Sequence, residues 1–290
     1  GWANWLRENW ADETTRCYYH FAWSHNELGE PREIFTYDKI HSRKWKWKAP
    51  VHELLFNEDT GSNLYYGENT LDLFDEIHLH HYPDQTKSRA SYLPLLELRA
   101  EENPEDHYGL IYLAHEYYYR HKYGKSIALL NKILKNYSNK YSNLEKASCY
   151  LFMGDSFTAI AESSNDNAQK KDMLNNAIIS YMDAIRIDES YREPYLNMAK
   201  AFIILNDHAS AEFYIKLAIK KSYRHYTWLE RDTSWTYEPW DLLCQASYYN
   251  GNKKDSIVYA SKALSFEPNN KRLQSNLDCC LSLTDDKELL

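Results

Sequence analysis

Apolar and polar residues alternate in the first part of the chain, which is the pattern of β-strands. Two such runs, 15–23 and 33–37, are rich in aromatic and β-branched residues and flank a turn at Gly29-Glu30-Pro31, so they predict a hairpin. The same composition predicts two further short strands, at 51–56 and 76–82. The beginning of the chain is therefore expected to be rich in β-structure.

From Lys87 onward the apolar positions recur with a period of about 3.6 residues, which predicts helix. A first helix through Tyr92 and Leu96 is expected to stop near Asn103-Pro104. Glycine and proline number only eight each, too few turn-forming residues for an all-β protein. Helix is therefore expected to dominate the rest of the chain.

The helical part repeats itself. Small residues fall at Ala114, Gly154, Ala199 and Cys244, at intervals of 40, 45 and 45 residues. Bulky, aromatic and small residues stand around them in the order of a tetratricopeptide (TPR) repeat, whose ideal length is about 34 residues. Insertions account for the excess, and we place them at 163–171 and 224–234. Small residues let the two helices of a repeat approach closely, and each pair buries its apolar stripe against the next.

Composition and charge exclude several classes of function. The net charge of −8 gives no general basic field, so nucleic acid is not an expected partner. No apolar run has the roughly 18–20 residues that a membrane helix needs, and no signal peptide is evident, so we expect a cytoplasmic protein without a transmembrane segment. The five cysteines lack CxxC spacing and are expected to be buried thiols. The aromatic-rich start at Gly1 suggests that the chain is a fragment of a longer protein.

Residues 38–55 carry the densest set of chemically useful side chains. Lys39, His41 and Arg43 alternate, as do Trp45 and Trp47, and alternation on a strand places each set on one face. Such a strip could bind an anionic group through its cations and stack a flat or sugar ring on a tryptophan. The same residues are explained equally well by structural roles. One tryptophan is expected to point inward, and the cations could prevent another strand from adding to an edge strand.

A histidine and a glutamate, His52 and Glu53, end this strip. Together they could supply a metal ligand and a proton acceptor, or form a structural pair at the end of a strand. The histidines at 78, 80 and 81 could likewise suggest a metal cluster, but they have no cysteine or carboxylate set beside them, and structural roles are expected.

Three runs, from Tyr18, from Lys39 and from Ile77, together with the helical repeats, resemble the C-terminal part of family 2 glycosyltransferases that carry TPR repeats. The Pro-Val-His-Glu-Leu sequence at 50–54 is the most specific match. The resemblance implies an α+β chain: residues 1–86 as the acceptor-side remnant of a GT-A domain, 87–105 as a connecting helix, and 106–290 as TPR-like repeats. The Asp-x-Asp motif and nucleotide-binding half of the family are missing from this sequence.

The resemblance also implies roles. His52 would help to hold a divalent metal, Mn or Mg, with the diphosphate of a nucleotide-sugar donor, and Glu53 would act as the catalytic carboxylate. The strip Lys39, His41, Arg43, Trp45 and Trp47 would bind substrate. The implied function is part of an inverting transferase that acts on a protein, peptide or glycan acceptor. The partners expected with it are a separate donor-binding half or a second copy of the chain in a homo-oligomer.

A second hypothesis comes from the repeats. About two thirds of the chain is repeat, and such arrays present concave surfaces that bind peptides. The alternative function is therefore a non-catalytic TPR adaptor that binds a peptide or protein, with the β-rich segment serving as a cap.

Overall fold

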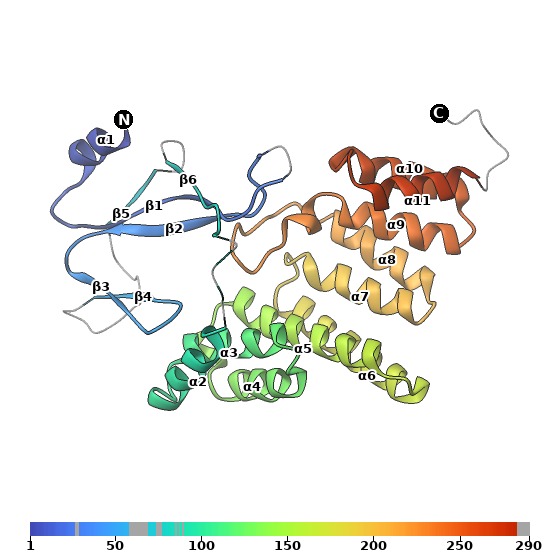
Figure 1. The fold of residues 1–290 in the computed structure, drawn as a ribbon, viewed down its shortest axis with the longest axis horizontal. Helices are drawn as coiled ribbons and strands as arrows, with labels where there is room; N and C mark the ends of the chain where they lie inside the picture. Colours follow the sequence, from blue (N-terminus) through green and yellow to red (C-terminus); the bar gives the residue numbers. More distant parts are fainter. Residues whose placement is uncertain are drawn as a thin grey trace. The chain divides into compact units, whose positions relative to one another are not determined.

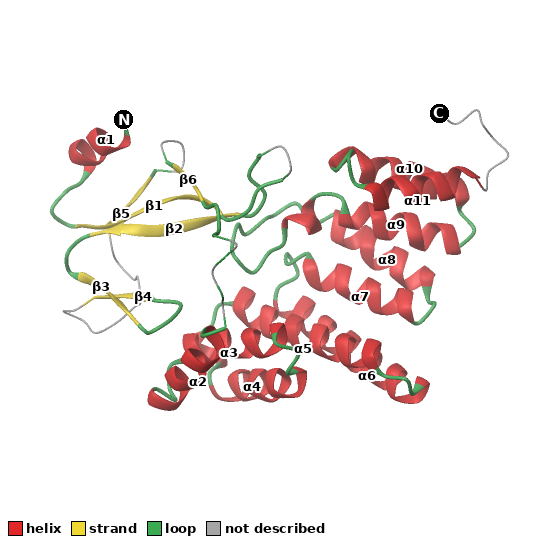
Figure 2. Ribbon diagram, in the orientation of Figure 1, coloured by secondary structure: helices red, strands yellow, loops and turns green. Residues whose placement is uncertain are grey.

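The computed structural model describes residues 1–26, 29–57, 69–73, 77–84, 86, 88 and 90–282. The chain divides into two compact units (Figure 1). The first comprises residues 1–113 with 226–228, and the second comprises 114–225 with 229–290. Figure 2 shows that strands are confined to the first unit and that the second is built from helices.

The predicted hairpin is confirmed as the centre of a small mixed sheet. Strands β1 (Thr14–Ala22) and β2 (Ile34–His41) pair antiparallel. On its other side β1 pairs in parallel with β5 (Asn69–Asp72) and β6 (His78–His80). Being central, β1 is largely buried, and Cys17, Tyr19 and Phe21 form the core with Leu73. Helix α1 (Trp2–Asn9), which the sequence patterns did not predict, packs Trp5 and Leu6 on this core.

A second, two-stranded sheet follows the first. Strands β3 (Trp45–Lys48) and β4 (Leu54–Asn57) pair antiparallel. Their connection contains Ala49 and His52 at positive φ, 86° and 50°, so it is a tight link and not the start of the predicted strand at 51–56. Helix α2 (Tyr92–Glu102) ends at Asn103 as predicted.

Helix pairs make up the remainder, as the repeat pattern predicted. Helix α3 (His107–Tyr119) spans the division between the units. The second unit continues with α4 (Tyr123–Asn136), α5 (Asn143–Ser163), α6 (Asn167–Ile187), α7 (Glu193–Ile204), α8 (His208–Ile219), α9 (Glu238–Tyr249), α10 (Lys253–Phe266) and α11 (Lys271–Ser282). The small repeat residues Ala114, Ala199 and Ala211 are completely buried between these helices.

The two insertions take different forms. The predicted loop at 163–171 is wrong, because α5 and α6 are each 21 residues long and leave only residues 164–166 between them. The extra residues before the fourth repeat do form an irregular connection, which runs from α8 to α9 and includes a short 3-10 helix, η2 (Asp232–Trp235). The second insertion therefore brings non-helical backbone into the repeat unit.

Candidate functional site

The predicted strip between residues 38 and 55 is not one strand. Lys39 and His41 belong to β2, Arg43 lies in the turn after it, and Trp45 and Trp47 belong to β3 in the other sheet. The alternation therefore does not place all five side chains on a single surface.

Trp45 is buried in the core of the first unit. Its residue is 1% exposed, and the guanidinium carbon of Arg16 lies 3.7 Å from its ring centroid. Arg16 is itself completely buried and donates from Nη1 to Asp38 Oδ2 at 2.7 Å. The guanidinium of Arg16 thus contacts the indole of Trp45 in the interior and the partly exposed carboxylate of Asp38.

The other residues of the strip are nearer the surface. Trp47 is 41% exposed, and His41 meets its ring edge-on with centroids 5.7 Å apart. Lys39 is exposed, with its Nζ 4.9 Å from the centroid of Tyr37, and Arg43 is exposed as well. Substrate binding by these residues stays a prediction.

His52 and Glu53 have different environments in the structure. The His52 ring stacks on Tyr112 at 4.1 Å with an interplanar angle of 5°, and Tyr112 in turn stacks on Trp228 at 5.3 Å. The backbone carbonyl of His52 accepts a hydrogen bond from buried Arg99 at 3.1 Å. Glu53 is exposed. His52 thus has a packing role, while the metal role for His52 and the catalytic role for Glu53 remain predictions.

Metal-ligating side chains are scattered in the described parts of the chain, where no group of three or more His, Cys, Asp or Glu is arranged to hold an ion. At the edge of the first sheet, His25 Nε2 and His80 Nδ1 lie 2.8 Å apart, and His81 stacks on Trp23. These histidines pair with each other and with aromatic rings.

The second unit contains a set of polar residues that the sequence analysis missed. His115, Asp155, Lys200 and Gln245 each follow the small residue of their repeat, on the first helix of each pair. Helix α5 contacts α7, and α7 contacts α9, so the equivalent positions on these helices form a row along the array. The signal was present in the sequence, as the residue one place after each small position.

Hydrogen bonds join this row across the repeats. Asp155 Oδ1 accepts from Asn197 Nδ2 at 2.6 Å and from the hydroxyl of Tyr181 at 2.8 Å. Lys200 donates to Asn197 Oδ1 at 3.4 Å and forms an ion pair with Glu238. Polar side chains of α5, α7 and α9 are therefore held in one connected system.

The connection between α8 and α9 adds a cation to this system. Arg231 donates from its guanidinium to Asn197 Oδ1 and from its backbone N–H to Glu193 Oε1, both at 2.8 Å. We call Asp155, Glu193, Asn197, Lys200, Arg231 and Glu238 the first-helix network. Nearby, Tyr191 donates to the carbonyl of Leu229 at 2.7 Å, and Arg192 lies over the Trp235 ring at 3.7 Å. The segment 229–238 is thereby fixed against α7.

Burial and charge set the ionisation of the network. Desolvation raises the pKa of the Glu193 carboxyl to about 7, although Arg231 opposes the rise. Desolvation also raises the pKa of Asp155, again against the charge of Arg231. At Glu238 burial acts in the same direction, but Lys200 and Arg231 outweigh it and lower the pKa to about 2. The network therefore holds carboxyls whose pKa values are shifted in opposite directions, upward at Glu193 and Asp155 and downward at Glu238.

Glu193 makes stability depend on pH. Its pKa in the folded chain, about 7, lies above the ordinary value of 4.5, so its contribution to stability is greatest below pH 4.5 and is lost as the pH rises through 7. Glu193→Gln is expected to remove this loss, which is at most about 3 kcal/mol at pH 8. Urea unfolding of the full chain at pH 5 and pH 8 measures it. Asp155 contributes in the same direction, so the variant is compared with the unmodified chain at each pH.

The matched control is Glu162→Gln, at an exposed position of α5. It should leave the pH dependence unchanged. Equal pH dependence of the unmodified chain and Glu193→Gln would show that Glu193 is solvated in the folded protein.

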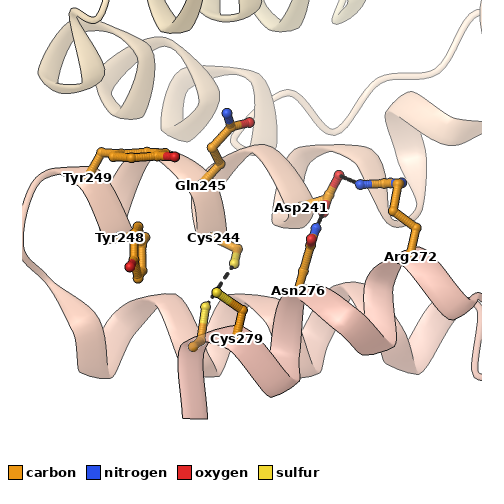
Figure 3. A pocket seen from close by; sticks show the side chains of 9 residues that line it. Asp241, Cys244, Gln245, Tyr248, Tyr249, Arg272, Asn276 and Cys279 are labelled. Atoms are coloured by element: carbon orange, nitrogen blue, oxygen red, sulfur yellow. Dashed lines mark hydrogen bonds and ion pairs between the residues drawn. The ribbon is translucent and has the colours of Figure 1, made fainter. Parts of the chain in front are cut away.

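A pocket of about 300 Å³ lies between α9 and α11 (Figure 3). Asp241 accepts hydrogen bonds from Arg272 Nη1 and Asn276 Nδ2, both at 2.8 Å. Tyr249 is 61% exposed and stacks on His208. The complete lining is Asp241, Cys244, Gln245, Tyr248, Tyr249, Arg272, Asn276, Cys279 and Cys280. We call His115, Asp155, Lys200 and Gln245 the polar row, and the surface formed by the first helices of the repeats the first-helix surface. Because Gln245 belongs to the polar row, the pocket is part of the first-helix surface.

Comparison with solved structures identifies the fold. TTC0263, a TPR protein of Thermus thermophilus, has a TM-score of 0.50 and 20% identity, and the match covers 66% of this chain and 89% of that one. YrrB, described as a TPR protein with an unusual peptide-binding site, has a TM-score of 0.48 and 14% identity over 67% of this chain and 86% of its own. MamA has a TM-score of 0.47 and 15% identity over 66% and 99%. No protein-family model and no curated protein matches the sequence.

The likeness to TTC0263 confirms the TPR fold of the repeats and corrects the glycosyltransferase resemblance, which is wrong. The runs that carry the resemblance are rich in tryptophan, histidine and basic residues. In the structure several of these side chains pack against other side chains, as Trp45 does under Arg16 and His52 does on Tyr112. The assignment of residues 1–86 to a GT-A domain rested on this resemblance and no longer has a basis. The same holds for the nucleotide-sugar donor and the divalent metal, which only the resemblance implied. What stands is a mainly helical TPR-like array with a few short strands.

Among the described helices, none combines the length and the apolar composition that crossing a bilayer requires.

Proposed function

We propose that this chain is a non-catalytic TPR adaptor that binds a peptide or protein partner along the first-helix surface of its repeats. The observation that carries the proposal is the pocket at the α9–α11 contact, which is bordered by Gln245, the exposed member of the polar row, and by exposed Tyr249. The other members of the row are engaged within the array, since His115 is buried and Asp155 and Lys200 bond to neighbouring side chains. The pocket beside Gln245 is therefore the place where a side chain of an extended peptide can enter.

The pocket between α9 and α11 is the part of this surface best suited to a partner. It has room for one or two side chains, it is about 300 Å³, and exposed Tyr249 forms part of its wall. Tyrosine and arginine are the residue types that contribute most to binding at protein interfaces, and Tyr248, Tyr249 and Arg272 all line this pocket. By contrast, the section formed by α5 and α7 already carries the chain's own segment 229–238.

Selection from a random peptide library on the full-length chain tests the proposal. A selected peptide is expected to bind with a dissociation constant below about 100 µM, and Tyr249→Ala combined with Gln245→Ala should weaken it at least tenfold. Both side chains border the pocket.

The matched control is Ile179→Ala with Phe213→Ala, which removes equally exposed side chains, 57% and 58%, from the second helices α6 and α8. These changes should leave the affinity unaltered. A library that yields no binder, or binders that respond to the second-helix variants and not to the pocket variants, would refute the proposed function.

A further inference from the structure

Two cysteines from different helices meet at the end of the array. Cys244 belongs to α9 and Cys280 to α11, and their sulfur atoms lie 3.6 Å apart. Both residues are nearly enclosed, with 4% and 5% of their surface exposed. Thirty-six positions separate them in the sequence, so the contact joins the first helix of the fourth repeat to the terminal helix.

The pocket gives a small reagent access to this pair. Cys244 and Cys280 both line the pocket. The dashed line that leaves the Cys244 sulfur in Figure 3 marks the contact between the two sulfur atoms. Cys279 lines the same pocket and is exposed. The other two cysteines of the chain, Cys17 and Cys149, are buried and belong to β1 and α5. Geometry and access thus coincide only at the α9–α11 contact among the described cysteines.

We propose that Cys244 and Cys280 are a site of reversible oxidation, at which a peroxide converts the two thiols into a disulfide between α9 and α11. One sulfur attacks the peroxide, which breaks the O–O bond, releases water and leaves a sulfenic acid. The second sulfur then displaces the hydroxyl group as water and forms the S–S bond. Two thiols and one hydrogen peroxide give one disulfide and two waters. A dithiol reductant returns both thiols.

Burial governs the rate of this reaction. Desolvation raises the pKa of the Cys244 thiol, and the neighbouring Cys280 adds to the rise, so little thiolate is present at neutral pH. Oxidation should therefore accelerate as the pH is raised toward 9. Once formed, the bond ties α11 to the array and resists separation of the two helices on heating. The proposal does not depend on partner binding.

Intact mass spectrometry of the full-length chain after treatment with hydrogen peroxide tests the site. The unmodified chain is expected to lose about 2 Da, the mass of two hydrogens, and to regain it with dithiothreitol. Cys279→Ser should behave in the same way, whereas Cys244→Ser and Cys280→Ser should not form the bond. Thermal unfolding of the oxidised chain without reductant should occur several degrees higher than that of the reduced chain.

The Cys279→Ser variant also resolves the two adjacent cysteines, since in that variant a peptide from the α11 region that is linked to Cys244 can contain only Cys280, and links to Cys17 or Cys149 have different peptide masses. Loss of the bond in Cys279→Ser, its persistence in Cys280→Ser, or gain of oxygen without a link would overturn the proposal. If Cys244→Ser fails to fold, as shown by its circular dichroism, Cys244→Ala replaces it. The linked peptide in Cys279→Ser decides the outcome even without that variant.

Discussion

Arg231→Met is expected to lower the free energy of unfolding of the full chain by about 3 kcal/mol at pH 7. The charge of Arg231 acts on three carboxyls, Asp155, Glu193 and Glu238, and its guanidinium also donates to Asn197. Methionine keeps much of the volume but leaves these buried acids without their shared cation. Urea unfolding followed by circular dichroism gives the loss, and hydrogen exchange in α5 and α7 locates it.

An exposed arginine provides the control. Arg186 forms an ion pair with Asp183 one turn away on α6, but its side chain is 75% exposed. Arg186→Met should therefore change stability by less than about 0.5 kcal/mol. A loss below about 1 kcal/mol for Arg231→Met would show that the charges of the three carboxylates are stabilised by water and not by Arg231.

Gly154→Ala should destabilise the chain by about 1–3 kcal/mol, although alanine is the better helix former. A Cβ atom at Gly154 would lie 2.7 Å from Cδ1 of Tyr181, whose ring is 1% exposed and whose hydroxyl is held by Asp155. The ring has no room to withdraw, so α5 and α6 must separate. Thermal unfolding of the full chain measures the effect as a lower Tm.

Gly124→Ala is the matched control, because Gly124 also lies in a helix, α4, and an added Cβ would meet nothing within 4 Å. This change is expected to be neutral or to stabilise by up to about 1 kcal/mol. If both variants raise the Tm, the close approach of α5 and α6 at Gly154 is wrong.

The repeats could be predicted from the sequence because their spacing is dictated by contact between neighbouring helices. Gly154 is recognisable as a small position, and the structure places the Tyr181 ring against it. Helix length was less predictable, since the polar run after Ser163 reads as a loop and is mostly the first turns of α6. Polar residues on the outer face of a helix are compatible with either state, and only packing further along the helix decides between them.

The candidate site could not be predicted in the same way. Asp155 and Arg231 are 76 positions apart, and no local pattern links the interior of α5 to an irregular connection before α9. The family resemblance failed for a related reason. Tryptophan, histidine and arginine serve binding and core packing equally well, and the burial of Trp45 beneath Arg16 depends on how β3 meets β1.

The long connection before α9 also limits how this array could be redesigned. Trimming it to the 34-residue repeat interval would preserve every helix, and an idealised sequence would regard the deletion as harmless. The deletion would nevertheless remove the only described cation whose charge acts on Asp155, Glu193 and Glu238 together, and Asp155 and Glu193 would remain buried without it. The irregular segment thus supplies positive charge to the repeats, and a shortened version of the protein would need neutral replacements for Asp155 and Glu193 to recover the lost stability, whereas Glu238 would keep its ion pair with Lys200.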